Sequence, residues 1–254
     1  MSDARFDFSG ERVVVTGAAG LIGRALVVRF AEAGATVLAV DRDADGLKVF
    51  ADRRFPGPGS VATLTADLAE EESAERVFAW VDAAGGLDVL VNNAALTEYR
   101  TPFIDLDTAT WDAVMGANLR SAYLLSVRAV RRWRDGGRGG VVINMSSPGG
   151  ARAHEDQSAY DVTKAGLEAL ARAIAVELGG LGIRANCIAP ASVVGDVRPT
   201  TDIPSGRTTS PDQVADAALF LASGAASQIN GHVVRVDGGL HARLRTDPSQ
   251  EQQR

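Results

Sequence analysis

The chain has 254 residues, of which 46% are hydrophobic and 23% charged, a composition that is ordinary for a globular protein and a length that suits one large α/β domain. Its formal net charge of −6 argues against a nucleic-acid-binding protein. The chain starts with polar residues, has no apolar run of membrane length and contains a single cysteine, so we expect a cytoplasmic protein without an internal disulfide.

Short β-branched runs alternate with longer helical patterns along the chain. Strands are predicted at residues 13–15, 36–40, 61–64, 87–91, 140–144, 183–188 and 232–236. Helices are predicted at residues 21–33, after the acidic residues 70–72, around residues 111–133, and at residues 160–178 and 213–222. Continuous apolar strands separated by helices predict a doubly wound, Rossmann-like parallel sheet with helices on both faces. Residues 1–240 are expected to form one domain, and residues 241–254 a polar, flexible tail.

A glycine-rich turn follows the first predicted strand and opens the first predicted helix. Glycines in this position let the backbone approach a pyrophosphate closely, and the start of the following helix offers free N–H groups to the phosphates. The residues expected to contact a dinucleotide here are Gly17, Ala19, Gly20, Leu21, Ile22 and Gly23.

An acidic residue, Asp41, ends the second predicted strand. A carboxylate at this point accepts hydrogen bonds from the adenosine ribose hydroxyls and repels the additional phosphate of NADP, so NAD(H) is favoured over NADP(H). The adjacent Arg42 could instead bind a 2′-phosphate, which keeps NADP(H) as the alternative.

Tyr160 and Lys164 lie one helical turn apart in a predicted helix, so their side chains project from the same face. Lys164 is one of only two lysines in a chain that otherwise uses arginine for positive charge. An ammonium beside a phenol stabilises the phenolate and lowers the phenol pKa from about 10. The pair therefore predicts an acid/base device.

Together these motifs resemble the short-chain dehydrogenase/reductase family in its single-domain branch, over residues 8–239. Further motifs of the family occur in the family's order along the chain. They are Asp67 and Leu68 after the third strand, Asn93 and Ala94 after the fourth, Asn118 in the next helix, Ser147 after the fifth strand, and Pro190 with Ala191 after the sixth. Pro190 and Val193 are expected to contact the cofactor.

The resemblance implies an oxidoreductase that interconverts a secondary alcohol and a ketone by hydride transfer with a nicotinamide cofactor. It implies that Tyr160 is the general acid/base, that Lys164 lowers its pKa and holds the nicotinamide ribose, and that Ser147 polarises the substrate oxygen. Asn118 is implied to position a water that links Lys164 to solvent. Asp67 and Leu68 are placed near the adenine. The family also implies a homotetramer or homodimer built through the helices around residues 111–133 and 160–178, and nothing indicates a metal site.

Four positions depart from the family pattern. Leu21 stands where the single-domain branch carries a glycine, and Gly195 stands where a threonine often contacts the nicotinamide amide. Ala95 and Ala191 replace glycines, which requires backbone angles within the range of alanine.

The substrate side of the predicted site is short and polar. Only residues 191–205 separate Pro190 from the next glycine–arginine pair, without a helical pattern, so we expect an open site. Polar loops at residues 98–100 and 152–157 favour a small polar substrate such as a sugar or cyclitol over an acyl chain. His154 in the second loop is a weaker candidate for the base than Tyr160. An NADP(H)-dependent 3-oxoacyl-type reductase and a non-catalytic NAD(P)-binding sensor or scaffold remain the alternatives.

Overall fold

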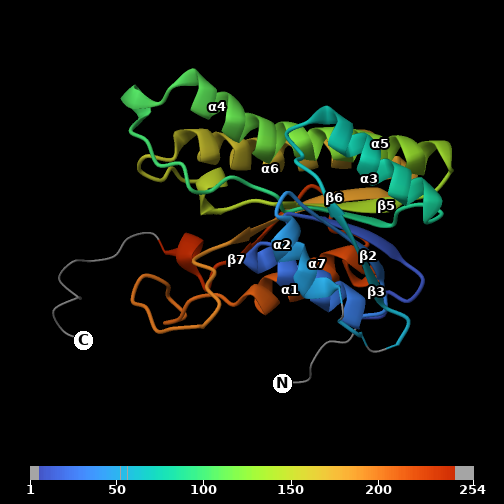
Figure 1. The fold of residues 1–254 in the computed structure, drawn as a ribbon. Helices are drawn as coiled ribbons and strands as arrows, with labels where there is room; N and C mark the ends of the chain where they lie inside the picture. Colours follow the sequence, from blue (N-terminus) through green and yellow to red (C-terminus); the bar gives the residue numbers. More distant parts are fainter. Residues whose placement is uncertain (1–5, 52, 56, 244–254) are drawn as a thin grey trace.

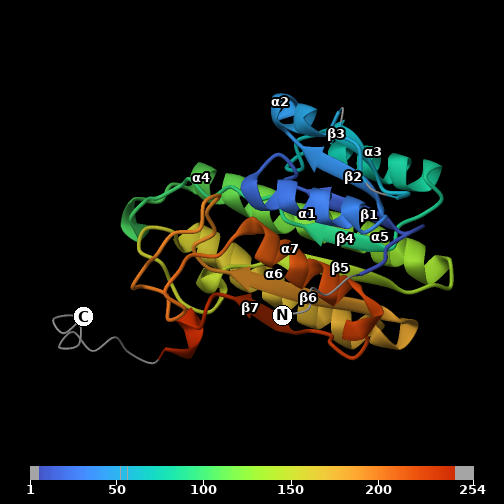
Figure 2. The same ribbon diagram turned by 90° about the horizontal axis from the view of Figure 1, so that it is seen from below.

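The computed structural model describes residues 6–51, 53–55 and 57–243, and within them a central parallel sheet carries the fold (Figure 1). Its strands lie in the order β3-β2-β1-β4-β5-β6-β7, which Figure 2 shows from β3 at the top to β7 at the bottom. Their bounds are β1 Arg12–Thr16, β2 Thr36–Asp41, β3 Ser60–Thr65, β4 Val89–Asn92, β5 Gly140–Met145, β6 Ile183–Pro190 and β7 Val233–Val236. The predicted doubly wound α/β fold is confirmed.

Helices cover both faces of the sheet. They are α1 Leu21–Glu32, α2 Ala44–Leu47, α3 Glu71–Ala83, α4 Thr108–Met115, α5 Ser121–Asp135, α6 Ser158–Leu178 and α7 Pro211–Ala222. In Figure 1, α1 and α7 lie below the sheet, while α3, α5 and α6 lie above it. Because strand side chains alternate between faces, Val13 and Val15 of β1 pack on the side of α1 and α7, and Val14 packs on the side of α3 and α5.

Trp133, a buried aromatic residue of α5, packs against the start of β5. The indole Nε1 of Trp133, in α5, donates to the Leu87 carbonyl at 2.6 Å. Its ring covers Gly140 so closely that a Cβ there would lie 2.1 Å from the ring atom Cε2. The start of β5 therefore needs glycine for packing reasons.

Two helices differ from the predicted pattern. The long helix predicted around residues 111–133 is divided into α4 and α5 by a π-helical turn over Gly116–Arg120. Such turns insert an extra residue into the helical hydrogen-bond ladder and occur often at functional sites. The short α2 is not predicted, because four residues are too few to show a period; Asp43 caps it by accepting the Gly46 N–H.

The described end of the chain includes only the first residues of the expected C-terminal tail. Residues Leu240–Ala242 form a 3₁₀ turn in which His241 bonds to Asp237, and residues 244–254 of the expected tail lie outside the described residues.

In the part of the chain that the structure describes, no helix has both the length and the apolar character needed to cross a membrane. Cys187 is fully buried, and burial raises the pKa of its thiol to about 12, which makes it an unreactive core cysteine.

The strand order reverses between β1 and β4, which are neighbours in the sheet. The connections that leave their carboxyl ends therefore run to opposite faces, which opens a crevice between them. The glycine-rich turn after β1 and the loop after β4 both border this crevice. The fold thus sets the place of the site before any side-chain chemistry is considered.

Candidate active site

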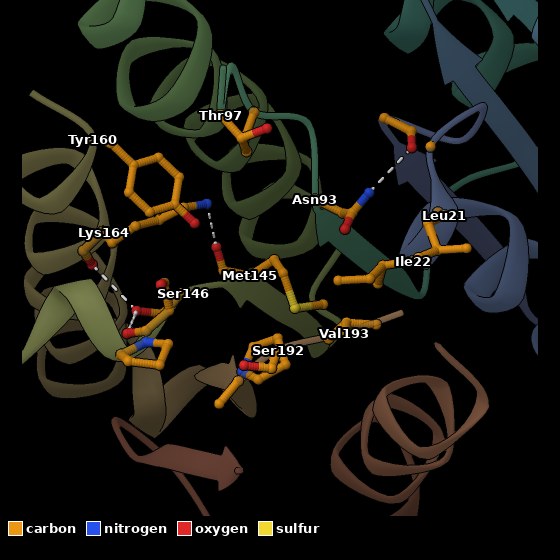
Figure 3. Close-up of a pocket in the computed structure, with 18 of the residues that line it drawn as sticks. Leu21, Ile22, Asn93, Thr97, Met145, Ser146, Tyr160, Lys164, Ser192 and Val193 are labelled. Carbon is orange, nitrogen blue, oxygen red and sulfur yellow. Dashed lines mark hydrogen bonds between the residues drawn. The ribbon is translucent and has the colours of Figure 1, made fainter. Parts of the chain in front are cut away.

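A cavity of about 560 Å³ lies at the carboxyl ends of the strands and joins most of the predicted site residues. Figure 3 shows Tyr160 and Lys164 on one side of it, and Leu21, Ile22 and Asn93 on the other. A smaller recess of about 100 Å³ adjoins it and shares Gly17 and Asp41. Its other lining residues include Arg42, Asp67, Leu68 and Ala94. Elements far apart in the sequence therefore meet in one continuous crevice.

The glycine-rich turn is shaped for close approach of a phosphate group. Gly17 has a φ of 64°, and a Cβ there would lie 2.8 Å from the Ala94 Cα. Gly20 precedes α1 and borders the cavity, and the only atom that a Cβ there would meet within 4 Å is the Gly17 carbonyl oxygen. The N–H groups of the first helical turn have no partner within the helix. The turn, the helix start and the open space in front of Gly20 therefore fit a dinucleotide pyrophosphate.

Asn93 fixes the two sides of the crevice to each other. Its Nδ2 donates to the Thr16 carbonyl at 2.9 Å and to the Gly17 carbonyl at 3.1 Å. The Thr16 hydroxyl in turn accepts the backbone N–H groups of Asn93 and Ala94. The predicted residue Asn93 thus holds the turn after β1 against the loop after β4.

Asp41 ends β2 with its carboxylate fixed at the border between cavity and recess. Its Oδ2 accepts the Ala19 N–H at 2.9 Å, and its Oδ1 accepts the Asp43 N–H at 2.9 Å. Each oxygen keeps a lone pair for a further donor. The neighbouring Arg42 is exposed, and its guanidinium lies 3.9 Å from Glu98 in the loop after β4. The carboxylate, rather than the guanidinium, is held firmly in place.

Lys164 is buried beneath the cavity. Its ammonium donates to the Met145 carbonyl at 2.7 Å and lies 5.2 Å from the centroid of the Tyr160 ring (Figure 3). Burial lowers the pKa of Lys164 to about 8. This lysine can therefore exchange a proton near neutral pH, which an exposed lysine does not do.

Tyr160 shows a pKa shift opposite to the expected one. Burial raises the pKa of its phenol, the charge of Asp161 raises it further, and the Ser147 hydroxyl opposes the rise. The expected lowering by Lys164 is not found, because the lysine ammonium is directed at the Met145 carbonyl and at the ring face. The phenol is accordingly a protonated acid at neutral pH in this arrangement.

Of the two serines that follow β5, only Ser147 is available to a substrate oxygen. The Ser146 hydroxyl donates to Glu168 at 2.7 Å. The Ser147 hydroxyl accepts the Gly149 N–H at 3.2 Å and borders the cavity next to Tyr160. This geometry agrees with the choice of Ser147 over its neighbour.

Asn118 lies in the π-helical turn but not on the cavity wall. Its Oδ1 accepts the Leu96 N–H at 2.7 Å, and its Nδ2 donates to the Leu96 carbonyl and the Thr163 hydroxyl. The side chain thus ties the loop after β4 to α6, one residue before Lys164. The side-chain oxygen keeps a second lone pair, so the expected contact to a water stays a prediction.

The structure accommodates the four residues that depart from the family pattern. Leu21 borders the cavity with Ile22 and Val193 (Figure 3), and a Cβ at Gly195 would lie 3.9 Å from a Leu21 methyl group. Ala95 and Ala191 have no positive φ, as expected. Among the described residues other than glycine, only Asp156 (60°) and Ser192 (47°) do.

The segment after β6 contains no helix up to α7, as predicted. Two isolated bridges, Val193 with Thr209 and Pro199 with Arg207, hold it together. Sequence reasoning missed several lining residues of the cavity, which include Thr97, Pro148, Ser192 and Leu240. It also missed Met145 as the acceptor for Lys164, although a buried lysine always requires one.

Comparisons with known proteins agree with this geometry. A family model described as enoyl-(acyl carrier protein) reductase matches residues 17–241. L-rhamnose 1-dehydrogenase (NAD(P)+) of Azotobacter vinelandii is 35% identical over 249 residues, covering 91% of this chain and 97% of that protein. D-threitol dehydrogenase of Mycolicibacterium smegmatis is 34% identical over 249 residues, covering 93% and 95%. The crystal structure of 3-ketoacyl-(acyl-carrier-protein) reductase from Brucella melitensis complexed with NADH superimposes with a TM-score of 0.82 at 29% identity, covering 92% and 99%.

Proposed function

Because this chain belongs to the short-chain dehydrogenase/reductase family and is an NAD(P)-dependent oxidoreductase acting on CH–OH groups, we propose that it interconverts a secondary alcohol and a ketone on a polyhydroxylated metabolite, with NAD(H) preferred. One observation carries the proposal. The cavity that Ser147 and Tyr160 border also contains the glycine-rich turn and Asp41. A reacting carbon bound beside Tyr160 is therefore next to the place that suits a nicotinamide cofactor.

Tyr160 and Ser147 act on the substrate oxygen. The bound cofactor supplies or accepts the hydride. The Tyr160 hydroxyl gives its proton to the ketone oxygen, or takes one from the alcohol in the reverse direction, while the Ser147 hydroxyl donates a hydrogen bond to the same oxygen. The raised pKa of the buried phenol keeps it protonated at neutral pH, so the proton that the ketone oxygen takes up is present on Tyr160.

Lys164 and Asn118 support this proton transfer from below. With its pKa lowered to about 8, Lys164 can exchange protons with its surroundings while the Met145 carbonyl holds it in place. Asn118 fixes Thr163 and the loop after β4, and so keeps α6 at the correct distance from the cavity. We assign Asn118 a positioning role.

The preference for NAD(H) rests on Asp41. Its two oxygens are anchored by backbone N–H groups and each has a lone pair left for a ribose hydroxyl. A 2′-phosphate at this place would meet a fixed negative charge. Arg42, the residue that would favour NADP(H), is exposed and lies near the carboxylate of Glu98.

The polarity of the cavity supports a hydroxylated substrate. Its lining includes the polar residues Thr97, Ser147, His154, Tyr160 and Ser192, beside the apolar Met145, Pro148 and Leu240. The similar proteins L-rhamnose 1-dehydrogenase and D-threitol dehydrogenase are named for polyhydroxylated substrates. A 3-oxoacyl substrate, for which the structurally similar reductase from Brucella melitensis is named, needs a longer apolar channel than these side chains form.

We further propose that copies of the chain associate through α5 and α6. A groove formed by the end of α4, the π-helical turn and the start of α5 against α6 has a volume of about 650 Å³ and an apolar wall that includes Met115, Leu119, Tyr123 and Leu170. Tyr123, which is 51% exposed, lies at its edge. Large exposed apolar patches of this kind mark association surfaces.

Steady-state assays with a set of polyols and sugars test the proposed function. We expect reduction of NAD⁺ with at least one polyol, and kcat/KM with NADP⁺ lower by about tenfold or more. Efficient reduction of a 3-oxoacyl thioester with NADPH and no polyol oxidation would instead establish the acyl reductase. Binding of NADH without turnover of any alcohol or ketone would establish a sensor.

A further inference from the structure

A histidine and an aspartate form a pair at the edge of the cavity, outside the serine, tyrosine and lysine set. His154 lies in the loop between β5 and α6, and Asp161 lies in the first turn of α6, next to Tyr160. The Asp161 carboxylate accepts twice from this one residue: Oδ2 from the His154 backbone N–H at 2.6 Å, and Oδ1 from the imidazole Nδ1 at 2.7 Å. The histidine ring is therefore fixed in orientation.

The pair is buried at one end and open at the other. The Asp161 side chain is 10% exposed, whereas the His154 side chain is 39% exposed and borders the cavity. The carboxylate thus lies behind the ring, away from the cavity. A buried acid that holds a half-exposed imidazole is an arrangement that orients a functional histidine.

The turn after Ser147 is shaped around this pair. A Cβ at Gly149 would lie 2.0 Å from the Asp161 Oδ1 and 3.0 Å from the His154 Cε1. The Gly149 N–H also donates to the Ser147 hydroxyl. One turn therefore positions both the proposed substrate-polarising serine and the histidine pair.

The hydrogen bond to Asp161 decides what His154 offers to the cavity. A carboxylate only accepts, so Nδ1 carries the proton of this hydrogen bond, and in that tautomer Nε2 keeps its lone pair. This nitrogen can accept a hydrogen bond from a hydroxyl. A substrate carboxylate has no proton to donate, and the buried negative charge behind the ring repels it.

The distance to Tyr160 suits a second oxygen of the substrate. The ring centroids of His154 and Tyr160 lie 6.4 Å apart, with both rings on the cavity wall. Two oxygens on neighbouring carbons, each at a hydrogen-bond distance of about 2.8 Å from its protein partner, can bridge such a separation. The hydroxyl next to the reacting carbon then faces the histidine.

We propose that His154, held by Asp161, is a substrate-binding residue that accepts a hydrogen bond from a hydroxyl on the carbon next to the reacting one. It selects vicinal diols and α-hydroxy ketones over simple alcohols and ketones. Asp161 is a positioning residue that acts through His154. This inference rests on the proposed function and names a structural feature of its substrate.

The test compares a vicinal diol with its counterpart that lacks the second hydroxyl. Propylene glycol and isopropanol are oxidised with NAD⁺ by the wild type, His154→Phe, His154→Gln and Asp161→Asn. For the wild type we expect a kcat/KM ratio of diol to alcohol of about 10 to 100. His154→Phe should lower this ratio to near unity, and the amide of His154→Gln should restore part of it.

For Asp161→Asn, too, the kcat/KM ratio of diol to alcohol is the quantity to compare with the wild type. The charge of Asp161 raises the pKa of Tyr160, so this variant changes the rates with both substrates together. A change common to both substrates cancels in the diol-to-alcohol ratio, so a lower ratio in this variant supports the positioning role. NADH titration of each variant, expected to match the wild type, checks that the fold is kept, and His154→Gln decides if His154→Phe does not fold.

These assays distinguish a failure of the inference about His154 from a failure of the proposed function. Equal loss of turnover on diol and alcohol in both His154 variants, or no loss on either, would overturn this inference and leave the proposed function standing. A wild type that oxidises neither these alcohols nor any polyol would refute the proposed function, and this inference with it.

Discussion

Replacing Asp41 by asparagine should reduce or abolish the preference for NAD(H). The substitution removes one negative charge and keeps the size of the side chain. It also keeps one oxygen, which can continue to accept the N–H of Ala19 or that of Asp43. The main consequences are weaker bonds to the ribose hydroxyls and less repulsion of a 2′-phosphate.

Two contributions set the size of the effect. A hydrogen bond to a charged group contributes about 1.5–3 kcal/mol, against about 0.5–1.5 kcal/mol for a neutral one, so each ribose bond loses about 1 kcal/mol. Repulsion between unit charges about 5 Å apart is roughly 1–3 kcal/mol at an effective dielectric constant of about 20–80, and Asp41→Asn removes it for NADPH. We therefore expect NADH to bind about 5–30-fold more weakly and NADPH about 5–100-fold more tightly.

Calorimetric titration of the wild type and the variant with each cofactor measures these changes. Asp43→Asn is the matched control. It makes the same change of charge two residues along the chain at an exposed position, and asparagine can still cap α2. An unchanged cofactor ratio in Asp41→Asn, or an equal shift in Asp43→Asn, would refute the assignment of Asp41 and direct attention to Arg42.

Further predictions concern the buried lysine, the packing at β5 and the association surface. Because burial lowers the pKa of Lys164 from 10.5 to about 8, the unfolded chain binds a proton that the native chain lacks between these pH values. Wild-type stability should therefore rise with pH across this window by up to about 3 kcal/mol relative to Lys164→Met, and parallel thermal unfolding curves would contradict this. Gly140→Ala drives a Cβ into the Trp133 ring and should lower Tm by about 3–10 °C, whereas an unchanged Tm would show that the ring yields. Tyr123→Glu should reduce the oligomeric state seen by sedimentation velocity, while Phe103→Glu, at a residue 81% exposed on the connection between β4 and α4, should not.

The sheet was predictable because its strands carry their signal locally. Residues 13–15, 36–40 and 140–144 are short apolar runs that a sheet covered on both faces requires, and each matches an observed strand. The glycine-rich turn and Asp41 follow from this placement, since the carboxyl ends of parallel strands meet along one edge. The cofactor side of the crevice could therefore be predicted largely from the sequence.

The substrate side was less predictable because it depends on non-local contacts. The π-helical turn that contains Asn118 has no periodic signature, so the sequence suggests one continuous helix. The bond between His154 and Asp161 depends on how a loop folds back onto α6, which residue spacing does not reveal. The pKa of Tyr160 depends on burial and on the direction of the Lys164 ammonium, and both are properties of the folded chain.

In the proposed reaction Tyr160 takes the proton from the alcohol during oxidation. The most direct test measures polyol-dependent reduction of NAD⁺ by the wild type and Tyr160→Phe, together with NADH affinity of both proteins. We predict turnover lower by about 10²–10⁴-fold in the variant, with NADH affinity unchanged. Undiminished turnover in Tyr160→Phe would contradict the account.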